Sequence, residues 1–390
     1  MKNAKEITIL WIGLLLFVGC TNKVVKTTPP QKTVPTPETK QLSMVAVGDA
    51  LIHGAVYVDA NTYQVGSDGY YQYDFTKMFT HIKDLIAPFD LKFYNQETVI
   101  GGKKLGLSHY PRFNSPDEIG LDLIKTGFNV VNLASNHTLD KGEPGAAYSA
   151  QFWENQDGIY AVGSYTSQEK RDLVRVEEKN GIKYSILSYT YGANGLPVPT
   201  GKEYLINLYS EEQVKKDIEN VRDQVDLLIV SMHWGTEYVN EPNELQRQQA
   251  NFLASLGVDV IIGHHPHVIQ PIEFINNTLV IYSLGNFISA QDSINKRIGM
   301  MASFTFQKTT LDGKTIDRKV TNVQADLLWT HYSSDYANFE VLPFHLVTEK
   351  HLKNATTVYE QYKKIVNPIN NEKIKVGFFE ADPIQKVEEQ

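Results

Sequence analysis

The chain has 390 residues, with 45 acidic and 37 basic side chains that give a formal net charge of −8. Because nucleic-acid phosphates are bound by clustered lysine and arginine, this charge argues against a nucleic-acid partner and against passive adhesion to anionic lipid. The length allows one large domain or two smaller ones, and a hydrophobic content of 42% is typical of a globular body. The single cysteine, Cys20, excludes an internal disulfide and a cysteine metal site.

Residues 1–19 have the pattern of a bacterial lipoprotein signal peptide. Lys2 and Lys5 precede an apolar run, 7–18, that is shorter than the apolar segment a transmembrane helix usually needs. The residues before Cys20 resemble a lipobox, with Phe17 where leucine is usual. This resemblance implies that Cys20 is lipidated and becomes the mature N-terminus; an uncleaved signal anchor is the alternative. Either route places the folded body on the extracytoplasmic face of the cell membrane.

The segment 20–42 is rich in proline, threonine and lysine and lacks the apolar residues needed for packing. Such a composition is typical of a flexible linker. We expect it to hold the folded body, predicted over residues 43–348, away from the membrane. Residues 349–390 are predicted to add one helix and a charged tail.

Apolar runs at 44–47, 91–94, 130–134, 226–232, 258–262 and 279–284 each end in polar residues. Such runs are typical of buried strands, and in an open α/β sheet ligands bind beyond the carboxyl ends of the strands. The polar residues that follow the runs include Asp49, His53, Asn95, Glu97, Asn136, His137, His233, Glu237, His264, His265, His267 and Asn286. We therefore expect one site built from distant segments, although 264–267 alone could be a polar surface loop. His265 and His267 would form a pair, because alternate residues of an extended segment point the same way.

Amphipathic segments between the runs predict helices over 75–86, 115–125, 210–221 and 245–256. Ser210 and Gln213 have the spacing of a capping box, and Gly127 and Gly257 suit the ends of the second and fourth helices. Alternating strands and helices predict an α/β fold with a mostly parallel central sheet. After about residue 297 the pattern changes to strands at 301–306, 320–328 and 339–347, which we expect to complete a second, antiparallel sheet.

The ordered motifs resemble the CapA family of capsule and poly-γ-glutamate biosynthesis proteins, which is related to the calcineurin-like metallophosphoesterases. The motifs are Gly48-Asp49, Asn95-Gln96-Glu97, Asn136-His137, His233-Trp234-Gly235, His265-Pro266-His267 and Ser283-Leu284-Gly285-Asn286-Phe287. The resemblance extends from about residue 43 to 288. It implies a calcineurin-like metallophosphatase fold, that is, an α/β sandwich with mixed central sheets flanked by helices.

The resemblance also implies a role for each matched position. The implied metal ligands are Asp49, Glu97, Asn136, His233, His265 and His267. Glu97 would bridge two ions, and His137 would be catalytic, acting on the leaving group or the transition state. Further candidates for ligands, or for residues that support them, are His53, His264, Glu237 and Asn286. The chain departs from the superfamily at two positions: the histidine of the first motif follows Asp49 by four residues instead of two, and the bridging carboxylate is Glu instead of Asp.

Carboxylate, amide and imidazole ligands without thiolate suit one or two divalent ions of Mn, Fe or Zn. Among the neighbouring residues, we expect Trp234 to shape the pocket by packing. Glu237 could orient His233 or be solvated, and Asp140 is expected to bond the backbone of its own loop.

These features predict a lipid-anchored CapA-like protein with a metallophosphoesterase-like site. Its expected partners are the membrane, through Cys20, and membrane subunits of a polymer synthase or exporter. Its expected substrate is an anionic polymer or a phosphoester. Two alternatives are a non-catalytic, polymer-binding accessory subunit and a general surface metal-dependent phosphoesterase.

Overall fold

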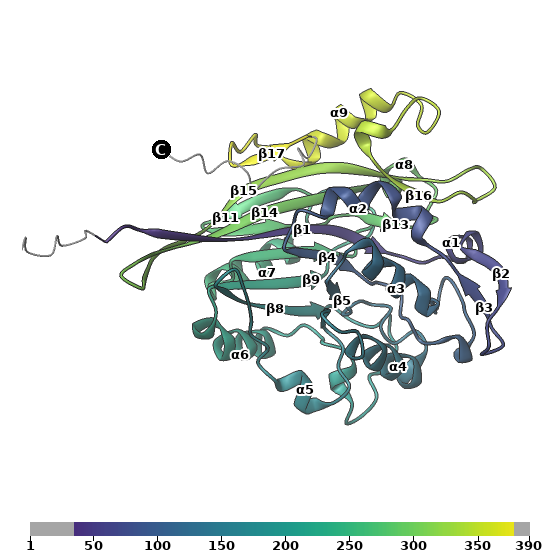
Figure 1. The fold of residues 1–390 in the computed structure, drawn as a ribbon, viewed down its shortest axis with the longest axis horizontal. Helices are drawn as coiled ribbons and strands as arrows, with labels where there is room; N and C mark the ends of the chain where they lie inside the picture. The colour runs from purple at the N-terminus through teal and green to yellow at the C-terminus, as the bar shows by residue number, and fades with distance from the viewer. Residues whose placement is uncertain (1–34, 378–390) are drawn as a thin grey trace, which may run out of the picture. The chain divides into compact units, whose positions relative to one another are not determined.

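The computed structural model describes residues 35–377, so the predicted signal peptide, Cys20 and most of the predicted linker lie outside it. Two sheets form the centre of the described part (Figure 1). The first sheet has the strand order β16 (Glu340–Pro343), β15 (Lys314–His331), β14 (Ile298–Leu311), β1 (Glu38–Ala50), β4 (Leu91–Asn95), β5 (Val130–Asn132) and β6 (Tyr160–Val162), with β13 (Asn286–Ile288) beside β1 and β17 (Ile374–Val376) beside β15. Strands β1, β4, β5 and β6 are parallel, and the pairs β1–β14, β14–β15 and β15–β16 are antiparallel.

The second sheet has the order β11 (Ile272–Ile275), β12 (Thr278–Ile281), β10 (Val260–His264), β9 (Leu227–His233), β8 (Ile182–Thr190) and β7 (Glu177–Lys179). Its four inner strands are parallel, and β11 and β7 are antiparallel edges. A small separate hairpin joins β2 (Asn61–Val65) and β3 (Tyr71–Tyr73). Both main sheets are therefore mixed.

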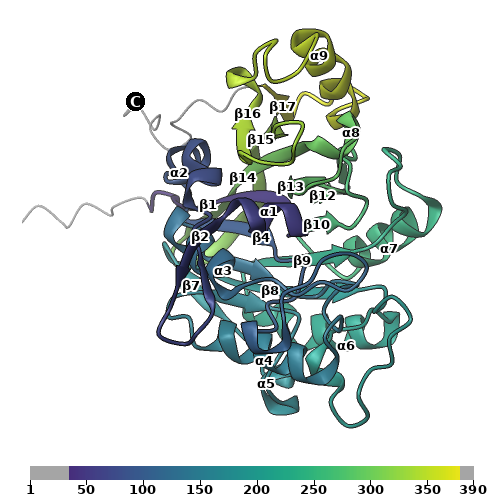
Figure 2. The ribbon, with the colours of Figure 1, turned by 90° about the vertical axis from the view of Figure 1, so that its right-hand side faces the viewer.

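Alternate side chains of the parallel strands face two different hydrophobic layers. Met44 and Phe93 of the first sheet pack with Ile229 and Ile262 of the second in one buried cluster between the sheets. The opposite face of the first sheet packs against α2 (Thr80–Ile86), α3 (Asp117–Thr126) and α4 (Gly142–Glu154), and that of the second against α6 (Glu211–Val221) and α7 (Glu244–Ser255). Figure 2 shows these helices outside the two sheets. The predicted α/β sandwich with mixed central sheets flanked by helices is confirmed.

The remaining elements are α9 (Ala355–Val366), with 12 residues, and several shorter helices and turns. The shorter elements are α1 (Gly54–Asp59), α5 (Gln168–Asp172), α8 (Ile294–Arg297) and the 3₁₀ turns η1 (Thr76–Phe79), η2 (Lys103–Leu105), η3 (Glu203–Leu205), η4 (Arg222–Gln224) and η5 (Phe344–Leu346). The helix predicted over 75–86 is divided into η1 and α2. The side chain of Ser210 accepts a hydrogen bond from Gln213 N, as predicted for the start of α6. Within residues 35–377, no helix has the length and apolar character needed to cross a membrane.

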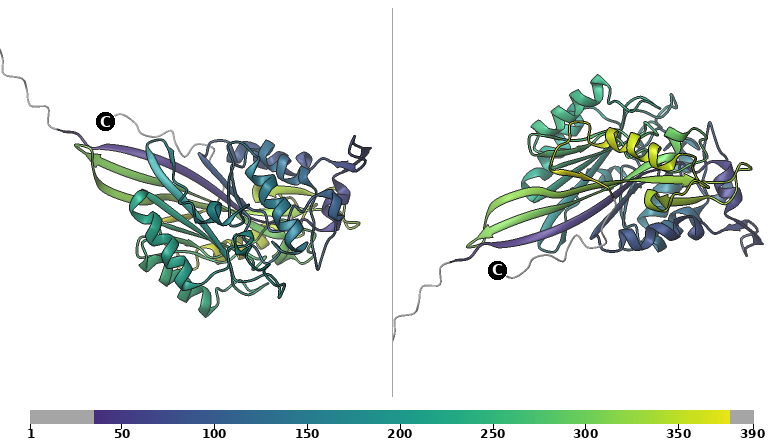
Figure 3. Two further views of the ribbon diagram at one scale, coloured as in Figure 1. Left: turned by 90° about the horizontal axis from the view of Figure 1, so that it is seen from below. Right: turned by 90° about the horizontal axis from the view of Figure 1, so that it is seen from above.

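The C-terminal strands differ from the prediction, because they extend the first sheet instead of completing a second one. The reason is the length of β1, whose residues 38–46 pair with 302–310 of β14. Figure 3 shows β1, β14 and β15 running side by side beyond the other strands. Residues 38–42, predicted as linker, are therefore a strand. Glu38 and Thr39 are exposed, Lys40 and Gln41 are half-buried and only Leu42 is buried, so the backbone pairing orders a segment that has no apolar pattern in the sequence.

The predicted boundary at residue 348 is also not a domain boundary. Val366 of α9 and Ile374 of β17 belong to the hydrophobic cluster between the sheets. β17 pairs in parallel with β15 over Val323–Ala325. The helix expected after residue 349 is present as α9, whereas β17 was not predicted. The charged tail after residue 377 lies outside the described part.

Candidate metal centre

The carboxyl ends of strands from both sheets meet at one place. In the first sheet Asp49 of β1 is in register with Asn95 of β4 and with Asn286 of β13. In the second sheet His233 of β9 is in register with His264 of β10. The polar residues that end or follow these strands therefore lie together between the two sheets.

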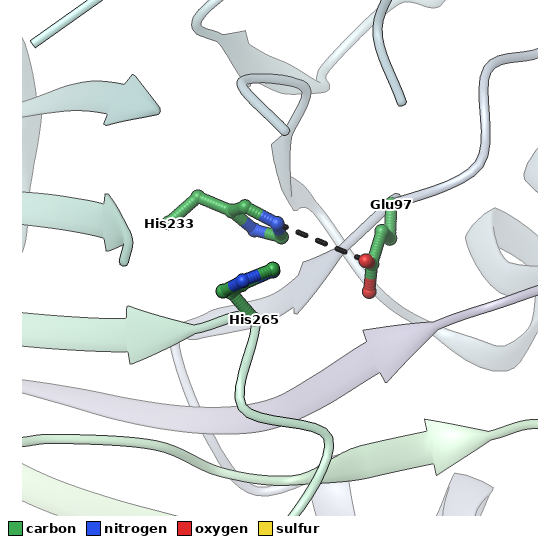
Figure 4. A group of neighbouring side chains, drawn as sticks. All are labelled: Glu97, His233 and His265. Atoms are coloured by element: carbon green, nitrogen blue, oxygen red, sulfur yellow. Dashed lines mark ion pairs between the residues drawn. The ribbon is translucent and has the colours of Figure 1, made fainter. Parts of the chain in front are cut away.

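Of three overlapping groups of possible metal ligands in this region, two contain Glu97. The ligand atoms of Glu97, His233 and His265 lie within 4.8 Å of one another, and so do those of Asp49, Glu97 and His267. Figure 4 shows the first group, in which His233 Nε2 is 3.7 Å from Glu97 Oε1. In the second group, His267 Nε2 is 3.5 Å from the same Glu97 oxygen. Glu97 is shared, which is the position that a carboxylate bridging two ions would occupy.

Asn136 lies beside the first group. Its Oδ1 is 2.9 Å from His233 Nε2, and its Nδ2 donates to Asn194 Oδ1 at 3.2 Å. The amide oxygen thus faces the same nitrogen that faces Glu97. All six predicted metal ligands are therefore brought together by the fold.

The residues fit a divalent cation, because several buried polar atoms here have no hydrogen-bond partner. Within the described residues, both carboxylate oxygens of Glu97 and the Nδ1 atoms of His233 and His265 are buried without a hydrogen bond. The side chains of Glu97 and His233 are fully buried. A buried carboxylate without donors is costly, and coordination of a metal removes that cost. The ligand set has no thiolate and suits Mn²⁺, Fe or Zn²⁺.

The charges of the centre are coupled. Burial raises the pKa of the Glu97 carboxyl well above its usual range, although the charge of His267 opposes the rise. Burial would also raise the pKa of Asp49, but its close contacts with His264 and His267 hold that pKa well below its usual range. Burial lowers the pKa of His267, but the charge of Glu97 and the contact with Asp49 reverse this and raise it to about 9. The His267 imidazolium thus supplies positive charge where a metal ion would supply it.

His265 and His233 behave differently. Burial lowers the pKa of His265 to about 3, and burial holds the pKa of His233 well below its usual range. Both imidazoles are therefore neutral at pH 7, which is the form that binds metal.

His137 is held by a carboxylate and does not belong to either ligand group. Its Nδ1 is 2.7 Å from Asp140 Oδ2, and both side chains are buried. The same oxygen accepts a hydrogen bond from Phe113 N at 2.7 Å, and the Phe113 ring meets the His137 ring edge to face at 4.7 Å. This arrangement fixes the imidazole and leaves Nε2 for the cleft. The prediction for Asp140 was therefore wrong: its carboxylate binds the His137 side chain and the backbone of Phe113, and not the backbone of its own loop.

The comparisons with known proteins agree with the motifs. The model of the bacterial capsule synthesis protein family PGA_cap matches residues 43–291. The chain belongs to this family. The PGA biosynthesis protein CapA of Bacillus subtilis (strain 168) is 28% identical over 285 residues, 68% of this chain and 68% of its own. The capsule biosynthesis protein CapA of Bacillus anthracis is 26% identical over 302 residues, 74% of this chain and 70% of its own.

Among solved structures, the 5′-nucleotidase of Candida albicans SC5314 aligns with 82% of this chain and 56% of its own, at 11% identity and a TM-score of 0.40. The predicted resemblance to the CapA family is confirmed by the family model and by the two Bacillus relatives.

The further candidate ligands of this PGA_cap protein, His264, Asn286 and His53, lie at different positions around the centre. His264 Nδ1 is 3.4 Å from Asp49 Oδ1, and its ring stacks on Phe93. Asn286 Oδ1 accepts a hydrogen bond from His267 Nδ1 at 3.0 Å and so helps to orient that ring. His53 lies in neither ligand group: its Nδ1 faces Leu51 O, and burial lowers its pKa to about 4.

Glu237 and Trp234, which follow His233 in the chain, have different surroundings. Glu237 is exposed and its carboxylate groups with His265 and His267, so it does not orient His233. Trp234 is almost fully buried, and its Nε1 donates to Tyr282 O at 2.9 Å while the two rings stack. Trp234 is therefore a packing residue, as predicted.

The loop that carries His265 and His267 is not extended. His265 has φ 97° and His267 has φ 57°, in the region that non-glycine residues rarely adopt. The two rings converge on Glu97 and its neighbours because of this turn, and not because alternate residues of a strand share a face. Strained backbone of this kind is concentrated at functional sites.

A chain of buried amides that supports Asp49 was not predicted. Asp49 Oδ1 accepts from Asn95 Nδ2 at 2.8 Å, and Asn95 Oδ1 accepts from Asn132 Nδ2 at 2.7 Å. The hydroxyl of Ser188, from the second sheet, donates to Asn132 Oδ1. The signal available was a single asparagine within the apolar run 130–134, too weak to indicate its partner.

A cleft of about 370 Å³ opens onto the centre. Its lining includes His53, Arg112, Phe113, Asn136, His137, Asn194, Glu237, Tyr238 and His267. The cleft thus gives a small polar ligand access to His137 and to one edge of the candidate metal centre.

Proposed function

We propose that this PGA_cap protein is a metal-dependent phosphoesterase-like protein that acts in making, exporting or attaching an anionic surface polymer of the capsule or poly-γ-glutamate type. The observation that carries the proposal is Glu97, a buried carboxylate without hydrogen-bond donors that is shared by two groups of possible metal ligands. The names of the two Bacillus relatives support the link to polymer biosynthesis.

The chemistry follows from the positions of the side chains. When bound, one or two divalent ions would stabilise charge on a phosphoryl group. Asp49, Glu97, Asn136, His233, His265 and His267 would hold them. As the oxygen of a water molecule bonds to phosphorus and the bond to the leaving oxygen breaks, His137 would give a proton to the leaving oxygen. The attacking water would release a proton to solvent, and His137 would regain one from solvent. Asp140 would keep the imidazole in the orientation needed for this transfer.

The proposed location is the extracytoplasmic face of the cell membrane, with lipid on Cys20 as the anchor. The support is the sequence pattern of residues 1–20, which lie outside the described part. A membrane-anchored position would place the cleft where a growing surface polymer or its exporter is found. Membrane subunits of a polymer synthase or exporter are the proposed partners.

The test combines metal analysis, hydrolysis and complementation. We expect the purified full chain to bind Mn²⁺, Fe or Zn²⁺ and to hydrolyse 4-nitrophenyl phosphate or bis(4-nitrophenyl) phosphate. We also expect a strain lacking the gene to recover polymer with the wild type but not with His137→Ala. Recovery with His137→Ala, without any hydrolysis, would contradict the proposal and indicate a non-catalytic accessory. Fast hydrolysis of nucleotides with no polymer defect in the deletion strain would indicate a general phosphoesterase.

A further inference from the structure

The loop of residues 108–114 forms one wall of the cleft and is tied to the residue that orients His137. Ser108 and Asn114 pair as a β-bridge, and Ser108 Oγ donates to Arg112 O at 2.7 Å. On the other side of Arg112, Phe113 N donates to Asp140 Oδ2. The backbone of Arg112 is therefore held from both directions, directly beside the His137–Asp140 pair.

Arg112 differs from the other arginines of the chain. The guanidinium groups of Arg171, Arg175, Arg222, Arg247, Arg297 and Arg318 each contact a carboxylate, a backbone carbonyl or an aromatic ring. Within residues 35–377, the guanidinium of Arg112 makes no ion pair, hydrogen bond or ring contact, although its side chain is exposed at the cleft. An arginine with a fixed backbone and a free head group is suited to bind an anion that arrives from solution.

The charged residues that line the cleft suggest what the Arg112 guanidinium can bind. Among the described residues that line it, Arg112 is the only lysine or arginine, and Glu237 is an exposed carboxylate. Asp49 and Glu97 lie deeper. A ligand with two anionic groups can place one at the metal centre, and Arg112 then offers the second a permanent positive charge in the lining.

We propose that Arg112 binds an anionic group, a carboxylate or a phosphate, on the leaving-group portion of the substrate. This inference rests on the proposed function, because His137 marks the leaving-group side and Phe113, next to Arg112, contacts His137. The substrate class is then a phosphoester whose leaving group carries a second negative charge. A guanidinium binds either anion with two parallel hydrogen bonds, so the geometry of the anion is recognised together with its charge.

The test measures binding, so it is independent of turnover. The full chain loaded with Mn²⁺ is titrated in a calorimeter with phenylphosphonate, with (2-carboxyphenyl)phosphonate and with 1,2-phenylenebisphosphonate. We expect the wild type to prefer at least one of the doubly anionic compounds over phenylphosphonate. Arg112→Gln is expected to bind that compound about tenfold more weakly, which corresponds to the loss of one charge-assisted hydrogen-bonded contact. Its affinity for phenylphosphonate is expected to equal that of the wild type. The compound that shows the loss identifies the anion as carboxylate or phosphate.

Two further variants serve as controls for the charge of Arg112 and for the net charge of the protein. Arg112→Lys keeps the charge without the planar fork and is expected to recover only part of the affinity. Arg318→Gln makes the same change of charge at an exposed site on β15 that does not line the cleft, and it is expected to change nothing. Equal affinity of the wild type for all three compounds, or equal losses for all three in Arg112→Gln, would overturn the assignment. An Arg112-dependent preference without hydrolysis of any phosphoester would leave it standing and refute the hydrolytic function alone.

Discussion

Asp140 contacts His137 through a single carboxylate oxygen, 2.7 Å from Nδ1, and that oxygen also accepts the hydrogen bond of Phe113 N. One carboxylate thus fixes both the proposed acid and the wall of the cleft that faces it. We expect Asp140→Asn to retain bound metal but to lower hydrolysis by one to two orders of magnitude, because the amide can hold the imidazole less well and the proton transfer depends on its orientation. Metal analysis together with kcat checks this prediction. Loss of metal would show that Asp140 supports the ligands instead.

Glu97→Gln tests the shared carboxylate. Gln removes a carboxyl whose oxygens accept no hydrogen bond, but it also removes the negative charge 3.5 Å from His267 Nε2, so in EDTA we expect the variant to unfold at the same temperature as the wild type or lower. With saturating Mn²⁺, the wild type is expected to gain about 3–4 kcal/mol and the variant almost nothing. Thermal unfolding with and without metal measures both effects. A variant that is stabilised by Mn²⁺ as strongly as the wild type would exclude Glu97 as a ligand.

His265→Ala and His137→Ala should separate binding from catalysis. His265 belongs to a ligand group, so its loss is expected to reduce bound metal and, through linkage, thermal stability. His137 belongs to neither group, so His137→Ala should keep its metal and lose about two to four orders of magnitude in turnover. Elemental analysis and kinetics of the two variants, side by side, provide the measurement. Metal loss in both would refute this division of roles.

Metal binding should depend on pH in a defined window. The pKa of His267 in the metal-free fold is raised from 6.5 to about 9, so its bound proton stabilises that fold fully below about pH 6.5 and the contribution disappears as pH rises through 9. A metal ion must displace this proton. We therefore expect the apparent affinity for Mn²⁺ to rise by about tenfold per pH unit between pH 6.5 and 9, with protons released on binding. Calorimetry in buffers of different ionisation enthalpy measures the release, and a flat profile would show that His267 is not displaced.

Cys20→Ala tests the proposed anchor. If Cys20 is the lipidated residue, the variant should keep an uncleaved N-terminal segment or lose lipid, whereas the wild type should carry acyl chains and partition with membranes. Two acyl chains are needed for firm attachment, since one gives only marginal binding. Mass spectrometry of the N-terminal peptide gives the answer. A wild type that begins at Met1 would instead support a signal anchor.

The strand ends and their polar residues could be predicted because an apolar run followed by Asp, Asn or His has few explanations other than a buried strand with a site at its carboxyl end. Asp49, Glu97 and His233 follow that rule. The converging turn at His265 and His267 could not be predicted, since positive φ angles at histidine leave no mark in composition. Asn132 and Ser188 support Asp49 through hydrogen bonds between residues that are 37 to 56 positions apart, and local patterns carry no information at such separations.

β1 connects two parts of the molecule that the proposed function treats separately. The strand begins at Glu38, within the segment predicted as a tether, and carries Asp49 near its other end. A strand advances by about 3.3 Å per residue, so these two residues are separated by about 36 Å along one rigid rod. With lipid on Cys20, the chemistry would take place a fixed reach away from the point where the chain enters the fold.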